Sequence, residues 1–264
     1  MVPIPWDATP AQLAGYVKQT NGLLFPGGGT SVSHGKYRDT GATLFRLAQQ
    51  ANEDGDVYPV WGTCLGFEEL MVLSVAPLDV LRKTQGTDPM LAPLALTAAA
   101  AQSRLLGGAG GAAARAALSG GNVTVHLHSW GVLSSTFGAT SGLGKFWQVL
   151  GTNVDSAGAQ FVSLAEARDY PFFACQFHPE KAAYEWEQGW CAGDAAAVAA
   201  AADAHSQAGI AAMAHMASAF VEVARQSRHQ PNPEQLIDRF PSQDLLRTVD
   251  LIPPKIMQTF VFAF

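Results

Sequence analysis

The amino-acid sequence predicts an α/β fold, a three-layer arrangement with a mostly parallel sheet between helices. Strand-like and helix-like segments alternate along the chain, as they do in this class of protein. Several strand-like runs are apolar and end in Gly or Pro, which is typical of strands buried on both faces. The chain has 264 residues, 48% of them hydrophobic, and is long enough for one large core. We therefore expect a single domain over residues 1–264.

The first half of the chain supplies the first strand–helix alternation. Residues 10–18 read as a short helix, and residues 22–25 as a strand that ends in a glycine-rich turn. Residues 40–52 have helical spacing, with the apolar face Leu44, Leu47, Ala48 and Ala51. Residues 57–61 are a buried-strand candidate. Residues 67–73 are expected to be helical, with two glutamates in the first turn, where the helix dipole favours them.

The second half continues the pattern. Strands are expected at residues 123–127, 161–164 and 171–177, and a long amphipathic helix at residues 210–226. Two stretches are rich in Ala and Gly. The first, residues 97–121, contains Gly107–Gly111, which we expect to be a flexible loop, and the second, residues 192–204, is expected to form a helix or a solvated insertion. The final apolar run, Phe260–Phe264, is expected to pack back on the domain.

Composition excludes several classes of protein. The net charge is −6 and no run of five basic residues occurs, so a nucleic-acid partner is not expected. No run of 18 apolar residues occurs, so no membrane span is expected. Three cysteines cannot make a disulfide framework. Residues 1–6 lack the features of a signal peptide and read as the end of a strand, so we expect the fold to lack its first strand.

Cys64 is the strongest candidate for a catalytic residue. It is the centre of Gly62-Thr63-Cys64-Leu65-Gly66, which follows an expected strand and precedes an expected helix. This spacing matches the nucleophile elbow, in which the residues two before and two after the nucleophile approach closely and must be small. We expect the dipole of the following helix to lower the pKa of the Cys64 thiol. The competing interpretation is a buried structural cysteine.

His178 is the candidate base, since it ends an expected strand at the sheet edge where the elbow also lies. Glu180, two residues further on, can hydrogen-bond the far imidazole nitrogen and fix the tautomer. The glycines that follow Phe25-Pro26 can point backbone N–H groups into a site, and Leu65 N–H supplies a second donor for an oxyanion. No Lys-Ser/Thr follows these glycines at Walker spacing, so a phosphate-binding loop is not favoured.

A zinc site is the rival constellation. His126 and His128 share one face of an expected strand, and Cys175 and His178 add a thiol and a third imidazole. The sequence has no H-E-x-x-H and no second C-x-x-C, so this alternative is weaker.

Three segments together resemble the γ-glutamyl hydrolases, which are cysteine peptidases with the class I glutamine-amidotransferase fold, a flavodoxin-like arrangement. They are FPGGG at residues 25–29, PVWGTCLGFEEL at residues 59–70 and FHPEKAAYEW at residues 177–186. Weaker similarity, including HLHSWGV at residues 126–132, extends the resemblance from about Pro3 to the end of the chain. The chain departs from the family by lacking the strand, helix and signal peptide that begin its members. It also carries an Ala-rich insertion at residues 187–204 and has Ala183 where Pro is usual.

The resemblance implies a role for each matching residue. Cys64 matches the nucleophile, His178 the general base and Glu180 the third triad member; Gly28 and Leu65 match the oxyanion hole, and His128 matches a residue that lines the substrate site. No metal or cofactor is implied. The implied substrates are folylpoly-γ-glutamates and related γ-glutamyl conjugates, whose carboxylates need a cationic site. Lys181 and Arg104 are the candidates for it. The resemblance further implies a vacuolar, lysosomal or extracellular location and allows a homodimer.

Three alternatives to γ-glutamyl hydrolysis remain open from the sequence. A glutamine amidotransferase domain shares the same triad, but this chain shows no synthase domain to receive ammonia. An inactive remnant or binding protein would result if the first strand is lost. A zinc hydrolase would use the His and Cys side chains instead of a thiol nucleophile.

Overall fold

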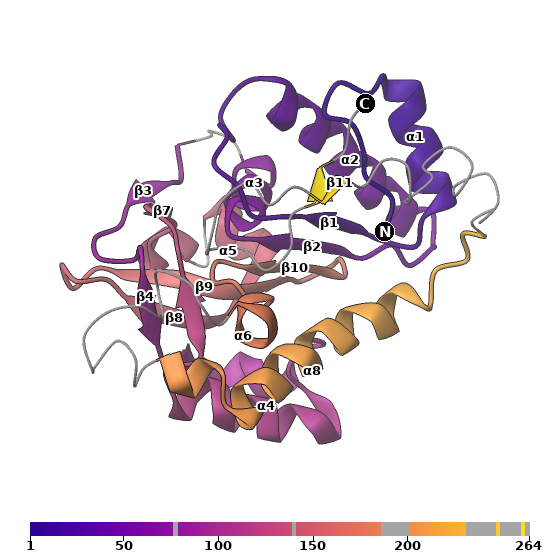
Figure 1. Ribbon diagram of the computed structural model, residues 1–264. Coiled ribbons are helices and arrows are strands. Elements are labelled where there is room, and N and C mark those ends of the chain that lie inside the picture. The colour runs from indigo at the N-terminus through magenta and orange to yellow at the C-terminus, as the bar shows by residue number, and fades with distance from the viewer. Residues whose placement is uncertain (76–78, 139–140, 186–200, 231–246, 249–259, 262–264) are drawn as a thin grey trace.

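The computed structural model describes residues 1–75, 79–138, 141–185, 201–230, 247–248 and 260–261. It confirms the α/β class and the three layers (Figure 1). The central sheet has six strands in the order β1 (Leu23–Phe25), β2 (Val60–Thr63), β10 (Phe172–Cys175), β9 (Gln160–Ala167), β8 (Trp147–Val154) and β5 (Ala95–Leu96).

The sheet is mixed, which corrects the expectation that it would be mostly parallel. Strands β1, β2 and β10 run parallel to one another, whereas β10·β9, β9·β8 and β8·β5 are antiparallel pairs. The reason is the short connection between β8 and β9, which reverses the chain within a few residues and cannot make a parallel crossover. Asp155 organises this turn by accepting the N–H groups of Ala157 and Ala159. The parallel part remains the part that carries the expected site.

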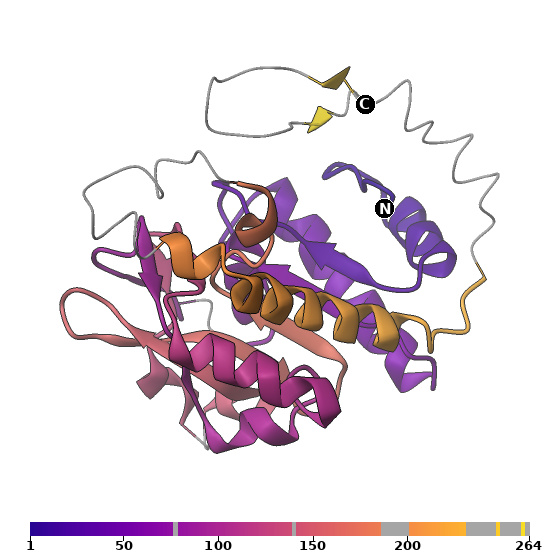
Figure 2. The same ribbon diagram turned by 60° about the horizontal axis from the view of Figure 1, so that its bottom comes forward.

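Helices cover both faces of the sheet, as Figures 1 and 2 show. On one face lie α1 (Pro10–Gln19), α2 (Lys36–Glu53), α3 (Leu65–Leu73) and α5 (Gly142–Phe146), and on the other α4 (Gly108–Gly120) and α8 (Gln207–Ala224). A hydrophobic core lies on each face of the sheet, and successive residues of β10 contribute to them in turn. Phe172 and Ala174 belong to the core beneath α1, α2, α3 and α5, and Phe173 and Cys175 belong to the core beneath α4 and α8. This alternation follows from the two-residue period of a strand, and it fixes which face each side chain enters.

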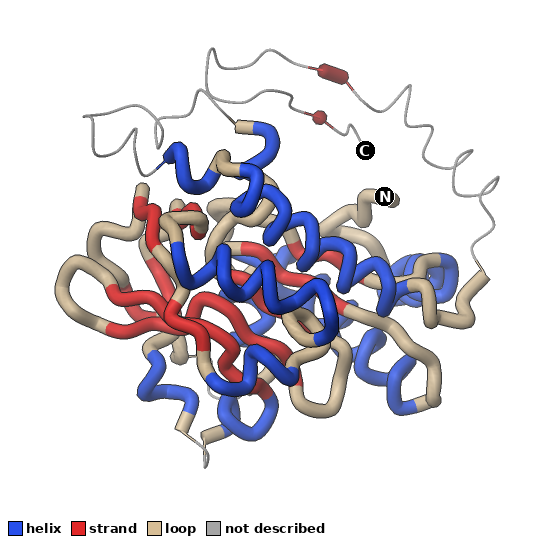
Figure 3. The backbone as a smooth tube through the Cα atoms, turned by 90° about the horizontal axis from the view of Figure 1, so that it is seen from below, coloured by secondary structure: helices blue, strands red, loops and turns tan. Residues whose placement is uncertain are grey.

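Shorter elements surround the sheet. Three two-stranded ribbons pair β3 (Arg82–Lys83) with β7 (Trp130–Gly131), β4 (Met90–Ala92) with β6 (Thr124–His126) and β11 (Arg247–Thr248) with β12 (Phe260–Val261). Two 3-10 helices span Ala98–Gln102 and Ser134–Phe137, and the short helix α6 (Lys181–Tyr184) follows the candidate base. The backbone trace in Figure 3 shows α4 and α8 lying side by side across the strands.

Several element predictions need correction. The stretch Gly107–Gly111 is the start of α4 rather than a flexible loop, because its glycines allow close approach: a Cβ on Gly111 would overlap the carbonyl of Leu106. The second strand spans Val60–Thr63, later than the expected residues 57–61, and the expected strand at 123–127 pairs with β4 outside the main sheet. Strand β8 was not predicted. Most of the Ala-rich insertion and the end of the apolar C-terminal run lie outside the described residues.

Over the residues that the structure describes, no helix combines the length and apolarity needed to cross a membrane.

Candidate active site

Cys64 lies on a sharp turn between β2 and α3, as the elbow spacing predicts. Its φ of 52° is the one positive φ of a non-glycine residue in the described part of the chain. Both flanking glycines are required sterically. A Cβ on Gly62 would lie 2.5 Å from the carbonyl oxygen of Gly66, and a Cβ on Gly66 would overlap the carbonyl of Phe25. The sequence therefore builds a strained turn that places the Cys64 side chain at the carboxyl edge of the parallel strands.

The surroundings of Cys64 oppose ionisation of its thiol. The residue is 5% exposed, and its sulfur lies 3.8 Å from the carbonyl oxygen of Leu127. Burial raises the pKa of the Cys64 thiol to about 12, and the Glu68 carboxylate adds to this, while a hydrogen bond from Leu65 N–H acts in the opposite direction. The expectation that the start of α3 would lower this pKa is therefore wrong, because desolvation outweighs the favourable donor. The thiol must lose its proton to a base.

His178 is placed to be that base. It follows β10, is 8% exposed, and its Nδ1 lies 2.6 Å from Oε1 of Glu180. Its main-chain N–H donates to the carbonyl of Val125 at 2.8 Å, which ties it to β6. Burial acts to raise the pKa of Glu180, but the hydrogen bond and charge of His178 outweigh it and leave this pKa below its usual value. Glu180 is thus an ionised acceptor that holds Nδ1–H, leaving Nε2 for chemistry.

Gly27 shows that the nucleophile and the base share one space. A Cβ built on Gly27 would lie 2.9 Å from Cε1 of His178 and 3.6 Å from Cβ of Cys64. The glycine loop after β1 therefore runs directly past both side chains. In the same loop, a Cβ on Gly28 would lie 3.1 Å from the Leu65 side chain, so the two predicted oxyanion positions are neighbours as well. The structure brings all of these predicted residues to one place.

Gly27→Ala is expected to impair catalysis far more than it impairs folding. The added methyl group would displace the His178 ring from its position in the site, and a displacement of this kind costs roughly 10²-fold in turnover. The measurement is kcat for a γ-glutamyl amide together with the thermal midpoint. Gly29→Ala is the matched control, because a Cβ at Gly29 meets no atom within 4 Å. Equal effects of the two substitutions on kcat would show that the close approach to His178 does not matter.

His128 lies beside the site but is already engaged. Its Nδ1 lies 2.8 Å from the carbonyl oxygen of Trp130, and its Nε2 lies 3.0 Å from Nδ1 of His126. Burial lowers the pKa of His128 to about 4 and holds the pKa of His126 well below its usual value, so both rings are neutral near pH 7. Since a carbonyl only accepts, His128 carries its hydrogen on Nδ1 and accepts at Nε2 from His126.

The zinc alternative finds no support in this geometry. Over the described residues, no group of three or more His, Cys, Asp or Glu side chains is arranged to hold a metal ion. Cys175, the thiol of that hypothesis, is completely buried and its sulfur is directed at the carbonyl of Phe177, 3.2 Å away.

Of the two candidate cations, one lies near the site. Lys181 is close enough to lower the pKa values of Cys64 and Glu180, and its ammonium pairs with Glu185 at 2.6 Å. Arg104 was misplaced by sequence reasoning. It contacts the carbonyl of Ala167 and Glu166, and Glu166 pairs with Phe173 near the amino end of β10, at the opposite edge of the sheet.

Glu68 is a neighbour of the nucleophile that sequence reasoning missed as a site residue. It is 7% exposed, and Nε2 of Gln176 donates to its Oε1 at 3.4 Å. Burial raises its pKa to about 7. The sequence could have indicated Glu68 by its position four residues after Cys64, since this spacing places both residues on the same side of α3. Its charge is the largest electrostatic contribution that raises the pKa of Cys64.

Glu68→Gln is therefore expected to make Cys64 more reactive toward iodoacetamide. Removing the carboxylate lowers the thiol pKa and raises the thiolate fraction, and we expect labelling about three- to tenfold faster. Because Glu68 titrates near pH 7, the gain should be full above that pH and vanish below it. Labelling rates from pH 5 to 9 test this. Glu69→Gln on the same helix is the control, and an equal gain there would contradict the assignment.

The sequence is similar to that of known proteins. The family model of the class-I glutamine amidotransferases matches residues 2–194. A gamma-glutamyl hydrolase of Rattus norvegicus is 36% identical over 188 residues, which cover 71% of this chain and 58% of that protein. Gamma-glutamyl hydrolase B of Dictyostelium discoideum is 32% identical over 238 residues, 90% and 65% of the two chains. A gamma-glutamyl hydrolase of Bos taurus is 33% identical over 230 residues, 87% and 67%. This chain thus spans 58% and 65% of the first two relatives' length.

Proposed function

Because the chain belongs to the class I glutamine amidotransferase family, and within it to the γ-glutamyl hydrolases, we propose that it hydrolyses γ-glutamyl amide bonds. The proposed substrates are folylpoly-γ-glutamates and related small γ-glutamyl conjugates, the class that the sequence motifs imply. The observation that supports the proposal most directly is the single space beside Gly27, which the candidate thiol and the candidate base both line.

The proposed first half-reaction forms a thioester. His178 Nε2 takes the proton of the Cys64 thiol as the sulfur attacks the γ-carbonyl carbon, which removes the need for a preformed thiolate. The N–H groups of Gly28 and Leu65 stabilise the resulting oxyanion. When the C–N bond breaks, His178 gives its proton to the departing amine. The γ-glutamyl group then remains bound to Cys64 as a thioester.

The proposed second half-reaction releases the acid. His178 takes a proton from water, and the hydroxide adds to the thioester carbonyl within the same oxyanion site. Collapse of the intermediate breaks the C–S bond, and the sulfur recovers its proton from His178. Throughout, Glu180 holds the imidazole through Nδ1 and stabilises its charged form.

Hydrolysis assays with mass spectrometry of the enzyme test this proposal. The chain is incubated with γ-glutamyl-7-amido-4-methylcoumarin and with pteroyl-tri-γ-glutamate, and the reaction is quenched with acid at early times. The expected result is release of product together with a mass increase on Cys64 that equals one γ-glutamyl group with the coumarin substrate and the pteroyl-bearing acyl fragment with pteroyl-tri-γ-glutamate. An α-linked isomer should not be cleaved. Ammonia release from free glutamine without cleavage of the γ-glutamyl conjugates would instead favour a glutamine amidotransferase domain, and no turnover by a folded chain would favour an inactive relative.

A further inference from the structure

An exposed aromatic–cation pair lies on the β3–β7 ribbon. Lys83 and Trp130 are cross-strand partners, and the ammonium of Lys83 lies 5.7 Å from the centre of the indole ring. Trp130 is 44% exposed. Within the described residues, no carboxylate forms an ion pair with Lys83, whereas its neighbour Arg82 is paired with Asp79 at 2.7 Å. The pair thus presents a cation that is not neutralised and an indole ring that is partly exposed.

This pair lies within a short reach of the nucleophile. The carbonyl of Leu127 is 3.8 Å from the Cys64 sulfur, and three residues of chain from Leu127 to Trp130 span at most about 11 Å. The carbonyl of Trp130 is also the group that holds His128. Figure 1 shows the ribbon beside the end of the sheet from which α3 begins. A substrate that extends outward from Cys64 by one or two residues can therefore reach it.

The charges around Cys64 favour binding of the distal carboxylates of such a substrate at the Lys83–Trp130 pair. The carboxylates of Glu68 and Glu180 act on the thiol, and the nearby cation Lys181 is paired with Glu185. The groups around Cys64 therefore do not neutralise a substrate that carries several carboxylates. We propose that Trp130 and Lys83 form a rim subsite that binds a free carboxylate of a γ-linked glutamyl chain beyond the scissile amide. Lys83 supplies the charge, and Trp130 supplies an apolar wall for the glutamyl methylenes. This proposal rests on the proposed function.

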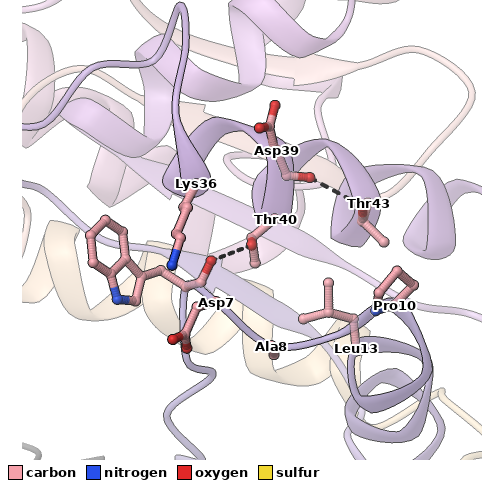
Figure 4. A pocket seen from close by; sticks show the side chains of 9 residues that line it. Asp7, Ala8, Pro10, Leu13, Lys36, Asp39, Thr40 and Thr43 are labelled. Atoms are coloured by element: carbon pink, nitrogen blue, oxygen red, sulfur yellow. Dashed lines mark hydrogen bonds between the residues drawn. The ribbon is translucent and has the colours of Figure 1, made fainter.

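A second aromatic–cation pair serves as the comparison. The ammonium of Lys36 lies 5.6 Å from the centre of the Trp6 ring, beside a pocket of about 290 Å³ (Figure 4). This pocket is also lined by Asp7 and Asp39, whose carboxylates repel a polyanion. The two pairs therefore have the same type of contact, but the Lys36 pair lies beside a pocket that two carboxylates line. This contrast makes Lys36→Ala a matched control for Lys83→Ala.

The test compares two substrates, one with and one without distal carboxylates. For each variant, kcat/KM is measured for pteroyl-tri-γ-glutamate and for γ-glutamyl-7-amido-4-methylcoumarin, and the ratio of the two values is taken. Lys83→Ala and Trp130→Ala are expected to lower this ratio about three- to tenfold, mainly through KM, whereas Trp130→Phe restores much of it and Lys36→Ala keeps it. Added salt should lower the wild-type ratio more than the Lys83→Ala ratio, because it screens the Lys83 charge.

The outcomes separate this proposal from the proposed function. An unchanged ratio in Lys83→Ala, or an equal fall in Lys36→Ala, overturns the rim subsite while leaving hydrolysis established. If the wild-type chain cleaves neither substrate, the proposed function fails, and binding of pteroyl-tri-γ-glutamate is then measured by quenching of tryptophan fluorescence. Weaker binding to Lys83→Ala than to Lys36→Ala would still support the subsite, and equal binding would overturn it.

Discussion

Replacing Cys64 by Ala is expected to lower kcat/KM for a γ-glutamyl amide by several orders of magnitude and to leave the fold intact. Cys64 is the proposed site of the thioester, and loss of a covalent nucleophile has costs of this order. The fold should persist because the methyl side chain fits where the thiol was, and the strained φ of 52° is no harder for Ala than for Cys. The measurements are initial rates and the thermal midpoint.

Cys175→Ala is the matched control for this prediction. Cys175 pairs with Thr63 on the neighbouring strand, but its side chain enters the core beneath α4 and α8 and is completely buried. Burial raises the pKa of its thiol well above the usual range. We therefore expect nearly full activity in this variant and slower iodoacetamide labelling at Cys175 than at Cys64. Faster labelling at Cys175, or a comparable loss of activity, would show that the nucleophile has been misassigned.

The sequence was sufficient to predict the sharp turn at Cys64 and the pairing of His178 with Glu180, because each is encoded in a few consecutive residues. Gly62 and Gly66 are required by contacts within the turn itself, and the His178–Glu180 hydrogen bond joins residues two apart. Convergence of the two motifs followed from the rule that parallel strands end at one edge. Gly27 could not be assigned in this way, since its role depends on contacts with residues far along the chain.

The pKa of Cys64 was mispredicted because burial is a property of the whole fold. The helix that follows the elbow is visible in the sequence, and it provides the expected Leu65 N–H donor. The surrounding side chains that exclude water, and the Glu68 carboxylate, come from packing that no local pattern reveals, and together they reverse the direction of the shift.

Strand predictions failed where tertiary contacts decide the outcome. Strand β8 includes Trp147, Gln148 and Asn153, a mixture without clear alternation, and it forms because β9 pairs along its length. Helix α4 begins in a run of glycines that disfavours helix in isolation. It forms because those small residues allow close packing, with Gly110 against His215 of α8. Local propensity is overridden in both cases by a partner that is distant in sequence.

The second large effect is expected from His178→Asn, with Glu180→Gln much milder. Asn cannot accept the thiol proton, so both half-reactions lose their general base, a loss of ~10²–10⁴-fold in kcat/KM. Gln at position 180 can still accept Nδ1–H through its amide oxygen. The Glu180 side chain is 51% exposed, so water also screens the charge that is removed, and a loss of about tenfold is expected.

The comparison of these two variants tests how the base is held. Glu180 lies on the turn into α6 rather than in the core, and the main-chain bond from His178 to Val125 anchors the backbone of the base without it. A solvated carboxylate on such a turn should tune the imidazole rather than determine its position. The test is kcat/KM of both variants, measured at matched thermal stability. If Glu180→Gln lost as much activity as His178→Asn, the carboxylate would be essential for the tautomer or charge of His178, and the main-chain anchor would not be sufficient to maintain a working base.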